Sequence, residues 1–394
     1  MAIKKFIKCE YCISERKMNM EKLKVMTIFG TRPEAIKMAP LVKKMEEYDE
    51  IESIVCLTAQ HREMLDMVVE LFNIKPDYDL NVMAHGQTIS DITVKVLKGM
   101  EDVLTKEKPD IVLVHGDTST TFVGALAAFY QKIKVGHVEA GLRSGNVYSP
   151  YPEEMNRKLT SSLASIHFAP TEGNYNNLIK EGIDRENIYI TGNTVIDALL
   201  SVVKENYKFE NELLNKIDYE NKRVIVMTCH RRENWGKPME DIFTGVKELA
   251  QENSDVDVIF PVHLNPNIRS LANHIMGDMK NIHLIEPLDY EPFANLLNKS
   301  YLILTDSGGI QEEAPALGKP ILVMRTETER PEAAEAGTVK VIGVEKEAIK
   351  EGVNLLLNDQ AEYDKMANAI NPYGDGSASQ RTVEALLKYF GYNK

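Results

Sequence analysis

The segment YLILTDSGGIQEEA, residues 301–314, passes from an apolar run through small residues into a helix-forming stretch. The run 301–304 is typical of a buried strand, and Ser307, Gly308 and Gly309 stand where a helix would begin. The two glycines permit a tight turn and let the backbone approach a ligand closely. A strand, a turn and a helix in this order predict a parallel α/β sheet.

The same alternation of short β-branched runs and helical stretches extends on both sides of this segment. In the second half of the chain, strands are predicted at 223–228, 256–261, 282–285, 301–304, 320–323 and 339–342. In the first half, they are predicted at 24–29, 53–57, 111–115, 135–138, 166–168 and 188–191, with helices at 33–48 and 118–131. Two such series predict an α/β protein of two Rossmann-like domains.

The two series also suggest the domain boundaries. We expect an N-terminal Rossmann-like domain formed by residues 23–192 plus 377–394, and a C-terminal one formed by residues 193–376. The final helix, predicted at 377–390 after a strong turn cluster, would return to the first domain. Residues 1–22 form an N-terminal extension without the apolar stretch of a signal peptide.

Composition excludes several classes of protein. The chain has 394 residues, of which 43% are hydrophobic and 27% charged, and its net charge of −13 disfavours nucleic acid as a partner. No apolar run is long enough to predict a membrane-spanning helix. The four cysteines, Cys9, Cys12, Cys56 and Cys229, do not suggest a disulfide framework, and a reducing cytoplasm fits them best. The single CxxC pair is either a metal motif or part of an unstructured terminus.

Open α/β sheets bind ligands at the carboxyl ends of their strands, so the residues after each strand are the candidates for function. After the first strand, Pro33 suits the first position of a helix whose N–H groups would face an anion. Arg32 and Lys37 add positive charge, which favours a phosphate site, although an ordinary capped turn explains the same residues. The GxGxxG fingerprint is absent, which argues against NAD or FAD.

Three acidic residues follow later strands of the first series. Asp117 stands where a strand gives way to a helix and is either a functional carboxylate or a helix N-cap. Glu139 precedes a glycine-containing loop and has no evident capping role. Glu153 and Arg157 are four residues apart on a predicted helix, where they form either a solvated ion pair or part of a site. Together these carboxylates make a plausible acid/base set.

In the second series, His230 follows a strand and is either structural or a phosphate ligand and proton carrier. Glu313, one turn into the helix after the two glycines, is suited to a ribose diol. Arg330 is a further basic group past a strand end, or simply a surface arginine. We interpret this region as a nucleotide-binding site.

Many segments of the chain from about Lys24 onward resemble the non-hydrolysing UDP-N-acetylglucosamine 2-epimerases. In chain order the segments are FGTRPEAIKMAP, TAQHREMLD, VHGDT, GHVEAGLRSG, YPEEMNR, ITGNTVIDALL, HRREN, PVHLNPN, TDSGGIQEEAP, ERPEA and NPYGDG. The resemblance implies a glycosyltransferase-B-like architecture, with the substrate in a central cleft between two Rossmann-like domains, and a homodimer. It also implies interconversion of UDP-N-acetylglucosamine and UDP-N-acetylmannosamine through elimination and re-addition of UDP, with no cofactor and no metal.

The resemblance assigns roles to matching positions. Asp117, Glu139 and Glu153 become the acid/base candidates, and His230 would lie near the leaving diphosphate. Substrate-binding roles fall on Arg32, Lys37, Arg157, Leu288, Phe293, Ser307, Gly308, Gly309, Glu313 and Arg330. Gln60 and Arg62 match the neighbourhood of a regulatory UDP-sugar site in some relatives, although the nearby stretch 84–87 lacks an arginine that such regulation uses.

Three other functions stay open from the sequence. A hydrolysing relative would release free N-acetylmannosamine and UDP. A glycosyltransferase of the same architecture would need an acceptor. A catalytically silent sensor would bind the UDP-sugar without exchanging the hydrogen at C2.

Overall fold

The structure, a computed structural model, describes residues 21–59, 62–84 and 86–392, and it divides into two compact units. Unit 1 contains the described residues up to Ala198 and those from Gly376 onward, and unit 2 is Leu199–Asp375. The first division falls within helix α8 (Thr194–Val202). Most of the N-terminal extension, including Cys9 and Cys12, lies outside the described residues.

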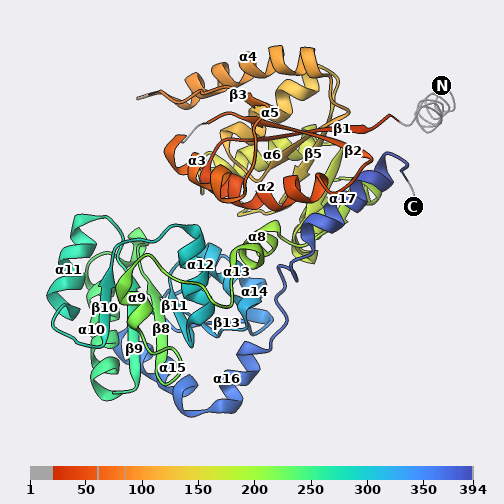
Figure 1. The fold of residues 1–394 in the computed structure, drawn as a ribbon. Coiled ribbons are helices and arrows are strands. Elements are labelled where there is room, and N and C mark those ends of the chain that lie inside the picture. Colours follow the sequence, from red (N-terminus) through yellow and green to blue (C-terminus); the bar gives the residue numbers. More distant parts are fainter. Residues whose placement is uncertain (1–20, 60–61, 85, 393–394) are drawn as a thin grey trace. The chain divides into compact units, whose positions relative to one another are not determined.

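Within the described residues, unit 1 contains a seven-stranded parallel sheet of order β3-β2-β1-β4-β5-β6-β7 (Figure 1). Its strands are β1 (Leu23–Phe29), β2 (Ile51–Leu57), β3 (Tyr78–Asp79), β4 (Ile111–His115), β5 (Lys134–Val138), β6 (Ile166–Ala169) and β7 (Ile188–Ile190). Its other helices are α2 (Arg32–Met45), α3 (Arg62–Leu71), α4 (Ile89–Glu107), α5 (Ser119–Tyr130), α6 (Glu153–Leu163), α7 (Glu172–Lys180), the 3-10 turn η1 (Arg185–Asn187) and α17 (Ala378–Tyr389).

Both faces of this sheet are buried, as expected for parallel strands joined by helices. Along β1, Val25 and Phe29 pack with one apolar cluster that includes residues of α2 and α17. Met26 and Ile28 belong to a second cluster with residues of α4 and α5. The side chains of one strand therefore alternate between two helical layers.

Helix α17 joins unit 1 although it follows the whole of unit 2 in the chain. It packs against α2, and Val383 and Leu386 are fully buried in the cluster that α2 helps to form. Asp197 on α8 accepts hydrogen bonds from the backbone N–H groups of Ala378 and Ser379, at 3.1 and 2.7 Å, and so holds the start of α17.

The described part of unit 2 contains a six-stranded parallel sheet of order β10-β9-β8-β11-β12-β13. Its strands are β8 (Arg223–Thr228), β9 (Val256–Pro261), β10 (Ile282–Ile285), β11 (Leu302–Thr305), β12 (Ile321–Val323) and β13 (Val339–Val341). Its helices are α9 (Glu212–Lys216), η2 (Arg232–Asn234), α10 (Lys237–Glu252), α11 (Pro266–Met276), α12 (Tyr290–Lys299), α13 (Gly308–Glu313), η3 (Ala314–Leu317), α14 (Pro331–Glu335), α15 (Lys346–Asn358) and α16 (Gln360–Ala367).

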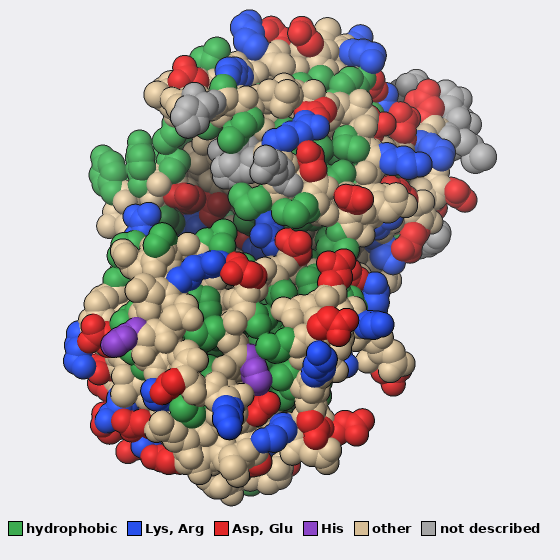
Figure 2. All heavy atoms as spheres, turned by 60° about the vertical axis from the view of Figure 1, so that its left-hand side comes forward, with side chains coloured by type: hydrophobic (Ala, Val, Ile, Leu, Met, Phe, Trp, Pro, Cys, Tyr) green, Lys and Arg blue, Asp and Glu red, His purple; other side chains and the backbone are tan. Residues whose placement is uncertain are grey.

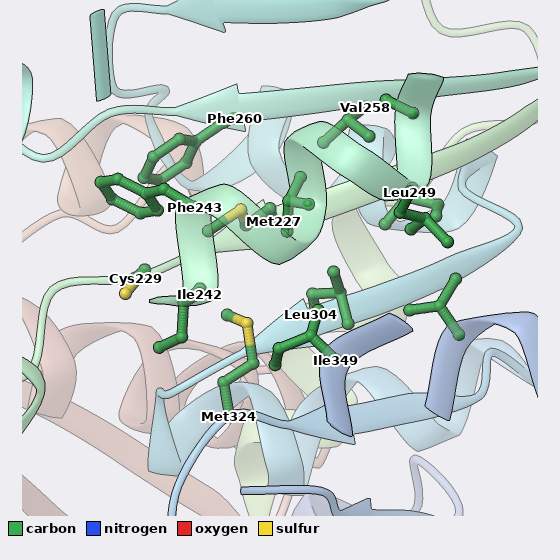
Figure 3. Packing of buried hydrophobic residues seen from close by; sticks show 14 of the residues in the cluster. Met227, Cys229, Ile242, Phe243, Leu249, Val258, Phe260, Leu304, Met324 and Ile349 are labelled. Carbon is green, nitrogen blue, oxygen red and sulfur yellow. The ribbon is translucent and has the colours of Figure 1, made fainter. Parts of the chain in front are cut away.

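The core of unit 2 forms where α10 and α15 cover the sheet. Phe243 on α10 meets Phe260 on β9 edge to face, with ring centroids 5.5 Å apart (Figure 3). Met227 and Ile349 belong to the same cluster, and all four side chains are almost completely buried. This packing fixes the strands whose ends carry the candidate site residues.

None of the described helices is both long and apolar enough to cross a membrane. Acidic and basic side chains are interspersed on the face drawn in Figure 2. Cys56 and Cys229 are buried as free thiols.

Candidate active site

The predicted acidic residues of unit 1 follow strands that lie side by side. β1, β4 and β5 are neighbours in the sheet, and the strand order reverses between β1 and β4. Such a reversal leaves a crevice at the carboxyl ends of the strands. Arg32 and Lys37 follow β1, Asp117 follows β4 and Glu139 follows β5. The topology therefore brings these side chains to one edge of the sheet.

Glu139 is surrounded by three nitrogen-bearing side chains. Lys37 on α2 forms a hydrogen-bonded ion pair with Oε2 of Glu139. Asn193, which follows β7, donates to the same oxygen at 3.0 Å. The Nε2 atom of His115, at the end of β4, lies 3.4 Å from it. Lys37 and Glu139, which the sequence placed in the site separately, are thus direct partners.

Two further properties set Glu139 apart. Its φ is +60°, a left-handed conformation that is uncommon for a residue other than glycine and that recurs at functional sites. Burial by itself raises the pKa of its carboxyl group, but Lys37 and His115 outweigh burial and hold the pKa well below its ordinary value. The group is therefore an anion at neutral pH.

Asp117 is held by Arg157 from helix α6. Nε and Nη2 of Arg157 lie 3.0 and 2.6 Å from Oδ2 of Asp117, and Nη1 lies 3.0 Å from Oε2 of Glu154. Glu154 is fully buried and also accepts the backbone N–H groups of Ser144 and Gly145. A single guanidinium therefore links the loop after β4 to the loop after β5.

The predicted ion pair between Glu153 and Arg157 is wrong, because Arg157 contacts Asp117 and Glu154 instead. Glu153 is the first residue of α6, and its Oε2 atom is buried without a hydrogen-bond partner among the described residues. In the described part of the chain it forms no ion pair with the cationic partners of Asp117 and Glu139. Glu153 stays a candidate by its position alone.

The turn after β1 is organised by Glu34 rather than by Arg32. The Glu34 carboxylate accepts the backbone N–H groups of Gly30 and Thr31, at 3.0 and 2.8 Å. Its other oxygen accepts the hydroxyl of Thr118, after β4, at 2.6 Å. This buried carboxylate joins two strand ends, while Arg32, half-buried at the start of α2, remains available to an anion.

In unit 2, the strand order reverses between β8 and β11, which are neighbours. His230 follows β8 and Asp306 follows β11. Oδ2 of Asp306 accepts the backbone N–H groups of His230 and Arg231 at 2.8 Å each, and Oδ1 lies 3.1 Å from Nδ1 of His230. The ring of His263 stacks on that of His230, with centroids 5.9 Å apart.

Asp306 remains ionised although it is fully buried. Burial raises the pKa of its carboxyl group, but the side chain and backbone of His230 and the N–H of Arg231 lower it more, so the net pKa lies below the usual range. An anion at this point favours a proton on Nδ1 of His230 and leaves Nε2 for a ligand.

The remaining predicted residues of unit 2 lie at or near the starts of the helices that follow β10, β11 and β12. Ser307 is the N-cap of α13, and Gly308 and Gly309 are its first two residues. A Cβ on Gly309 would lie 3.3 Å from Oε1 of Glu313. Arg330 forms an ion pair with Glu312. Leu288 and Phe293 are half-buried on either side of the start of α12, away from α13 in sequence.

The candidate regulatory residues are only partly described. Gln60 lies outside the described residues, and so does His85 in the stretch 84–87. Arg62 is exposed at the start of α3, where it pairs with Asp66 and Asp79.

Several functional candidates escaped the sequence reasoning. They are His115, Asn193, Glu154, Glu34 and Asp306. Four of them stand at or directly after strand ends or turns that had been singled out, which is the signal that would have found them. Glu154 is the exception, because only its burial distinguishes it from Glu153.

The fold and these strand-end residues define a protein of two Rossmann-like units, each with charged residues gathered at a topological reversal of its sheet. The predicted fold class is confirmed. Over residues 43–387 the chain matches the family model described as UDP-N-acetylglucosamine 2-epimerase, and it belongs to that family.

Known proteins agree with this assignment. The UDP-N-acetylglucosamine 2-epimerase of Bacillus subtilis is 54% identical over 375 residues, covering 95% of this chain and 98% of that protein. The S. aureus protein MnaA, solved with UDP, has a TM-score of 0.84 and 52% identity, covering 94% of this chain and 97% of its own. The Neisseria meningitidis UDP-GlcNAc 2-epimerase, solved with UDP-GlcNAc, has a TM-score of 0.81 and 52% identity, covering 93% and 100%.

Proposed function

We propose that this protein interconverts UDP-N-acetylglucosamine and UDP-N-acetylmannosamine by inverting C2 of the sugar without hydrolysing it. The observation that carries the proposal is the Glu139 carboxylate, held in a left-handed conformation beside Lys37, His115 and Asn193 at adjacent strand ends. The membership of the family and the UDP-GlcNAc bound to the Neisseria protein support the substrate.

The hydrogen at C2 of the sugar is not acidic, so its direct removal as a proton is difficult. In the proposed route, a base removes this proton while the C1–O bond breaks, so that UDP departs and a C1=C2 double bond forms in 2-acetamidoglucal. A phosphate oxygen of UDP then attacks C1, and a proton is delivered to the opposite face of C2. The two steps balance without redox change, and they need proton-handling groups on both faces of the sugar.

The proposal assigns the proton transfers to unit 1. Asp117, Glu139 and Glu153 are the carboxylates at hand, and two of them are fixed by cationic partners. Glu139 is ionised and therefore able to accept a proton. The ammonium of Lys37 beside it stabilises the charged form of this carboxylate. Fixed geometry of this kind lowers the barrier because no reorganisation is needed during reaction.

Unit 2 is assigned the uridine diphosphate. The backbone N–H groups of Gly308 and Gly309, the hydroxyl of Ser307 and the guanidinium of Arg330 suit the phosphates, while the N–H of Ser307 already donates to Oγ1 of Thr305 at 3.0 Å. His230, oriented by Asp306, has the lone pair of Nε2 directed to accept a proton, and it donates from Nε2 to the leaving diphosphate only when both ring nitrogens are protonated. Glu313 is assigned to the ribose diol, and the Leu288 backbone and the Phe293 ring to the uracil.

A homodimer is the proposed assembly. The resemblance to the family supports it, and Phe129 and Tyr130 expose 56% and 63% of their surface at the end of α5. Light scattering coupled to size exclusion tests it, and a particle of one chain mass at micromolar concentration would contradict it.

The decisive experiment follows UDP-N-acetylglucosamine by NMR in heavy water. We expect deuterium at C2 of both UDP-sugars and a steady mixture of the two. If free N-acetylmannosamine and UDP are the main products, the protein is a hydrolysing enzyme and the proposal is wrong. If C2 takes up no deuterium, the protein binds the UDP-sugar without catalysing its epimerisation.

The same assay tests the carboxylates. Asp117→Asn and Glu139→Gln are each expected to lower turnover at least ~100-fold, the usual scale for a lost acid or base. Glu47→Gln, which removes an exposed carboxylate on the same unit, is the matched control and should retain wild-type turnover. Wild-type turnover in Asp117→Asn or Glu139→Gln would remove that residue from the mechanism.

A further inference from the structure

Two guanidinium groups in unit 2 converge on Gly308. A Cβ built on Gly308 would lie 3.4 Å from Nη2 of Arg231 and 3.7 Å from Nη2 of Arg330. Both arginines therefore approach the same point of the backbone, at the first residue of α13. Like charges this close repel each other unless something negative stands between or beside them.

Among the described residues, no acidic side chain is paired with Arg231. Its Nε atom is buried without a hydrogen-bond acceptor, and its side chain forms no ion pair with any residue in the described part of the chain. The neighbouring arginines differ, since Arg330 pairs with Glu312 and Arg325 pairs with Glu233. Arg232, the next residue in the chain, is exposed and lies over the ring of Trp235.

The atoms left without partners are the ones that bind an oxyanion. In a guanidinium, Nε–H and one Nη–H form a parallel pair that matches two oxygens of a phosphate or carboxylate. In Arg231 the Nε is buried and unsatisfied, while Nη2 lies 3.4 Å from the position that a Cβ on Gly308 would take. A buried donor of this kind is rarely left unsatisfied when its ligand is bound.

The position of Arg231 does not depend on its side chain. Its backbone N–H donates to Oδ2 of the buried Asp306 at 2.8 Å, next to the same contact from His230. A substitution at Arg231 keeps this anchor, because the anchor uses only the main chain. A variant is therefore expected to fold and to keep His230 in place.

We propose that Arg231 is a diphosphate-binding residue that holds the uridine diphosphate together with Arg330 across Gly308. The inference rests on the proposed function for the identity of the ligand and adds a residue to which the sequence and the family resemblance gave no role. The ligand chemistry that this pair of arginines recognises is the doubly charged phosphate portion, not the nucleoside.

The test compares UDP with uridine. Dissociation constants of both are measured by calorimetry or by competition for the wild type, Arg231→Gln, Arg231→Lys and Arg232→Gln. We expect Arg231→Gln to weaken UDP binding roughly 10- to 100-fold, the scale of one charge-assisted bidentate contact, and to leave uridine binding unchanged. Arg231→Lys should recover only part of the loss, because a lysine lacks the fork.

Arg232→Gln is the matched control, since it removes the same charge one residue away from an exposed side chain, and it should leave the affinity for UDP unchanged. Unchanged UDP affinity in Arg231→Gln, or an equal loss for UDP and uridine, would overturn the role of Arg231. Failure of the proposed function has a different signature, because the wild type would then bind no UDP or would bind it without exchanging the C2 hydrogen.

Discussion

Arg157 binds one oxygen of Asp117 through two nitrogens, with Nε at 3.0 Å and Nη2 at 2.6 Å from Oδ2. The third nitrogen of the same guanidinium contacts Glu154, which is fully buried. The orientation of Asp117 therefore depends on Glu154. The predicted catalytic candidate is its neighbour in the chain, Glu153. The two adjacent glutamates can be separated by experiment.

Glu154→Gln is expected to destabilise the protein by about 3 kcal/mol, because removing one member of a buried ion pair leaves the other without full compensation. The lost carboxylate also accepts two backbone N–H groups, from Ser144 and Gly145. Urea unfolding at neutral pH measures the loss. Glu153→Gln is the control, since Glu153 makes no ion pair with Arg157.

Glu153→Gln should affect turnover rather than stability. We expect Glu153→Gln to lower turnover at least ~100-fold with little change in unfolding free energy, as for a residue that handles a proton. A Glu153→Gln protein that loses stability but keeps its activity would reverse the assignment of these two glutamates.

Asp306→Asn tests how His230 is oriented. The buried carboxylate of Asp306 lies 3.1 Å from Nδ1 of His230 and favours a proton there. An asparagine can turn its own NH₂ toward Nδ1, so the proton of the neutral ring should move to Nε2, and turnover should fall at least ~100-fold. Nitrogen-15 NMR of the His230 ring reports the tautomer directly. A wild-type ring already protonated on Nε2 would refute this account of the pair.

The acid stability of unit 1 should depend on His137. Burial lowers the pKa of its ring to about 3, and Nε2 lies 2.8 Å from the carbonyl oxygen of Gly116. The unfolded chain binds a proton on this ring near pH 6.5, which the folded chain does not accept until about pH 3. The depressed folded pKa therefore means that stability falls as the pH drops from 6.5 toward 3, by about 1.4 kcal/mol per pH unit.

The variant His137→Gln removes this titration. It should be less stable than the wild type at pH 7, and the difference in unfolding free energy should narrow by about 2 kcal/mol between pH 7 and pH 5. Urea unfolding of both proteins across this range makes the comparison. Curves that stay parallel would show that His137 does not contribute to the acid sensitivity.

Most of the fold follows from the sequence because its strands are apolar, β-branched and punctuated by turns. The predicted strand at 223–228 matches β8, and that at 111–115 matches β4. β3 escaped prediction because a two-residue strand shows no periodicity. The polar stretch 204–222 has no long apolar periodicity and forms only the short helix α9.

The site was predictable as far as it depends on strand ends. Glu139 was selected because a carboxylate there had no local role, and its partners Lys37 and His115 come from two other elements. Which of Glu153 and Glu154 faces Arg157 depends on the packing of α6 against the loop after β4. Neighbouring residues on a helix point about 100° apart, and the sequence does not show which of two identical side chains turns inward.

Two glycines in the loop after β5 offer a test of backbone geometry. Gly141 has φ +93°, and a Cβ there would lie 2.3 Å from the backbone oxygen of Asn174. Gly145 has φ +79° and nothing within 4 Å of the same atom. We expect Gly145→Ala to cost about 1 kcal/mol from backbone strain alone. Gly141→Ala should cost clearly more, because the main chain of α7 has to move.

Thermal or urea unfolding of the two alanine variants provides the measurement. Equal losses would mean that the approach of Asn174 to Gly141 is relaxed in solution, and the steric argument for this loop would fail.

Helix α17 completes unit 1 only after every residue of unit 2 has been synthesised. During translation, the residues of unit 2 form one continuous segment, which can begin to fold as it leaves the ribosome. The apolar surface of α2 stays uncovered until Val383 and Leu386 have been synthesised. The nascent first unit is therefore the part that needs protection from aggregation. A ribosome that stops before residue 378 would release a chain whose first unit lacks the helix that covers α2.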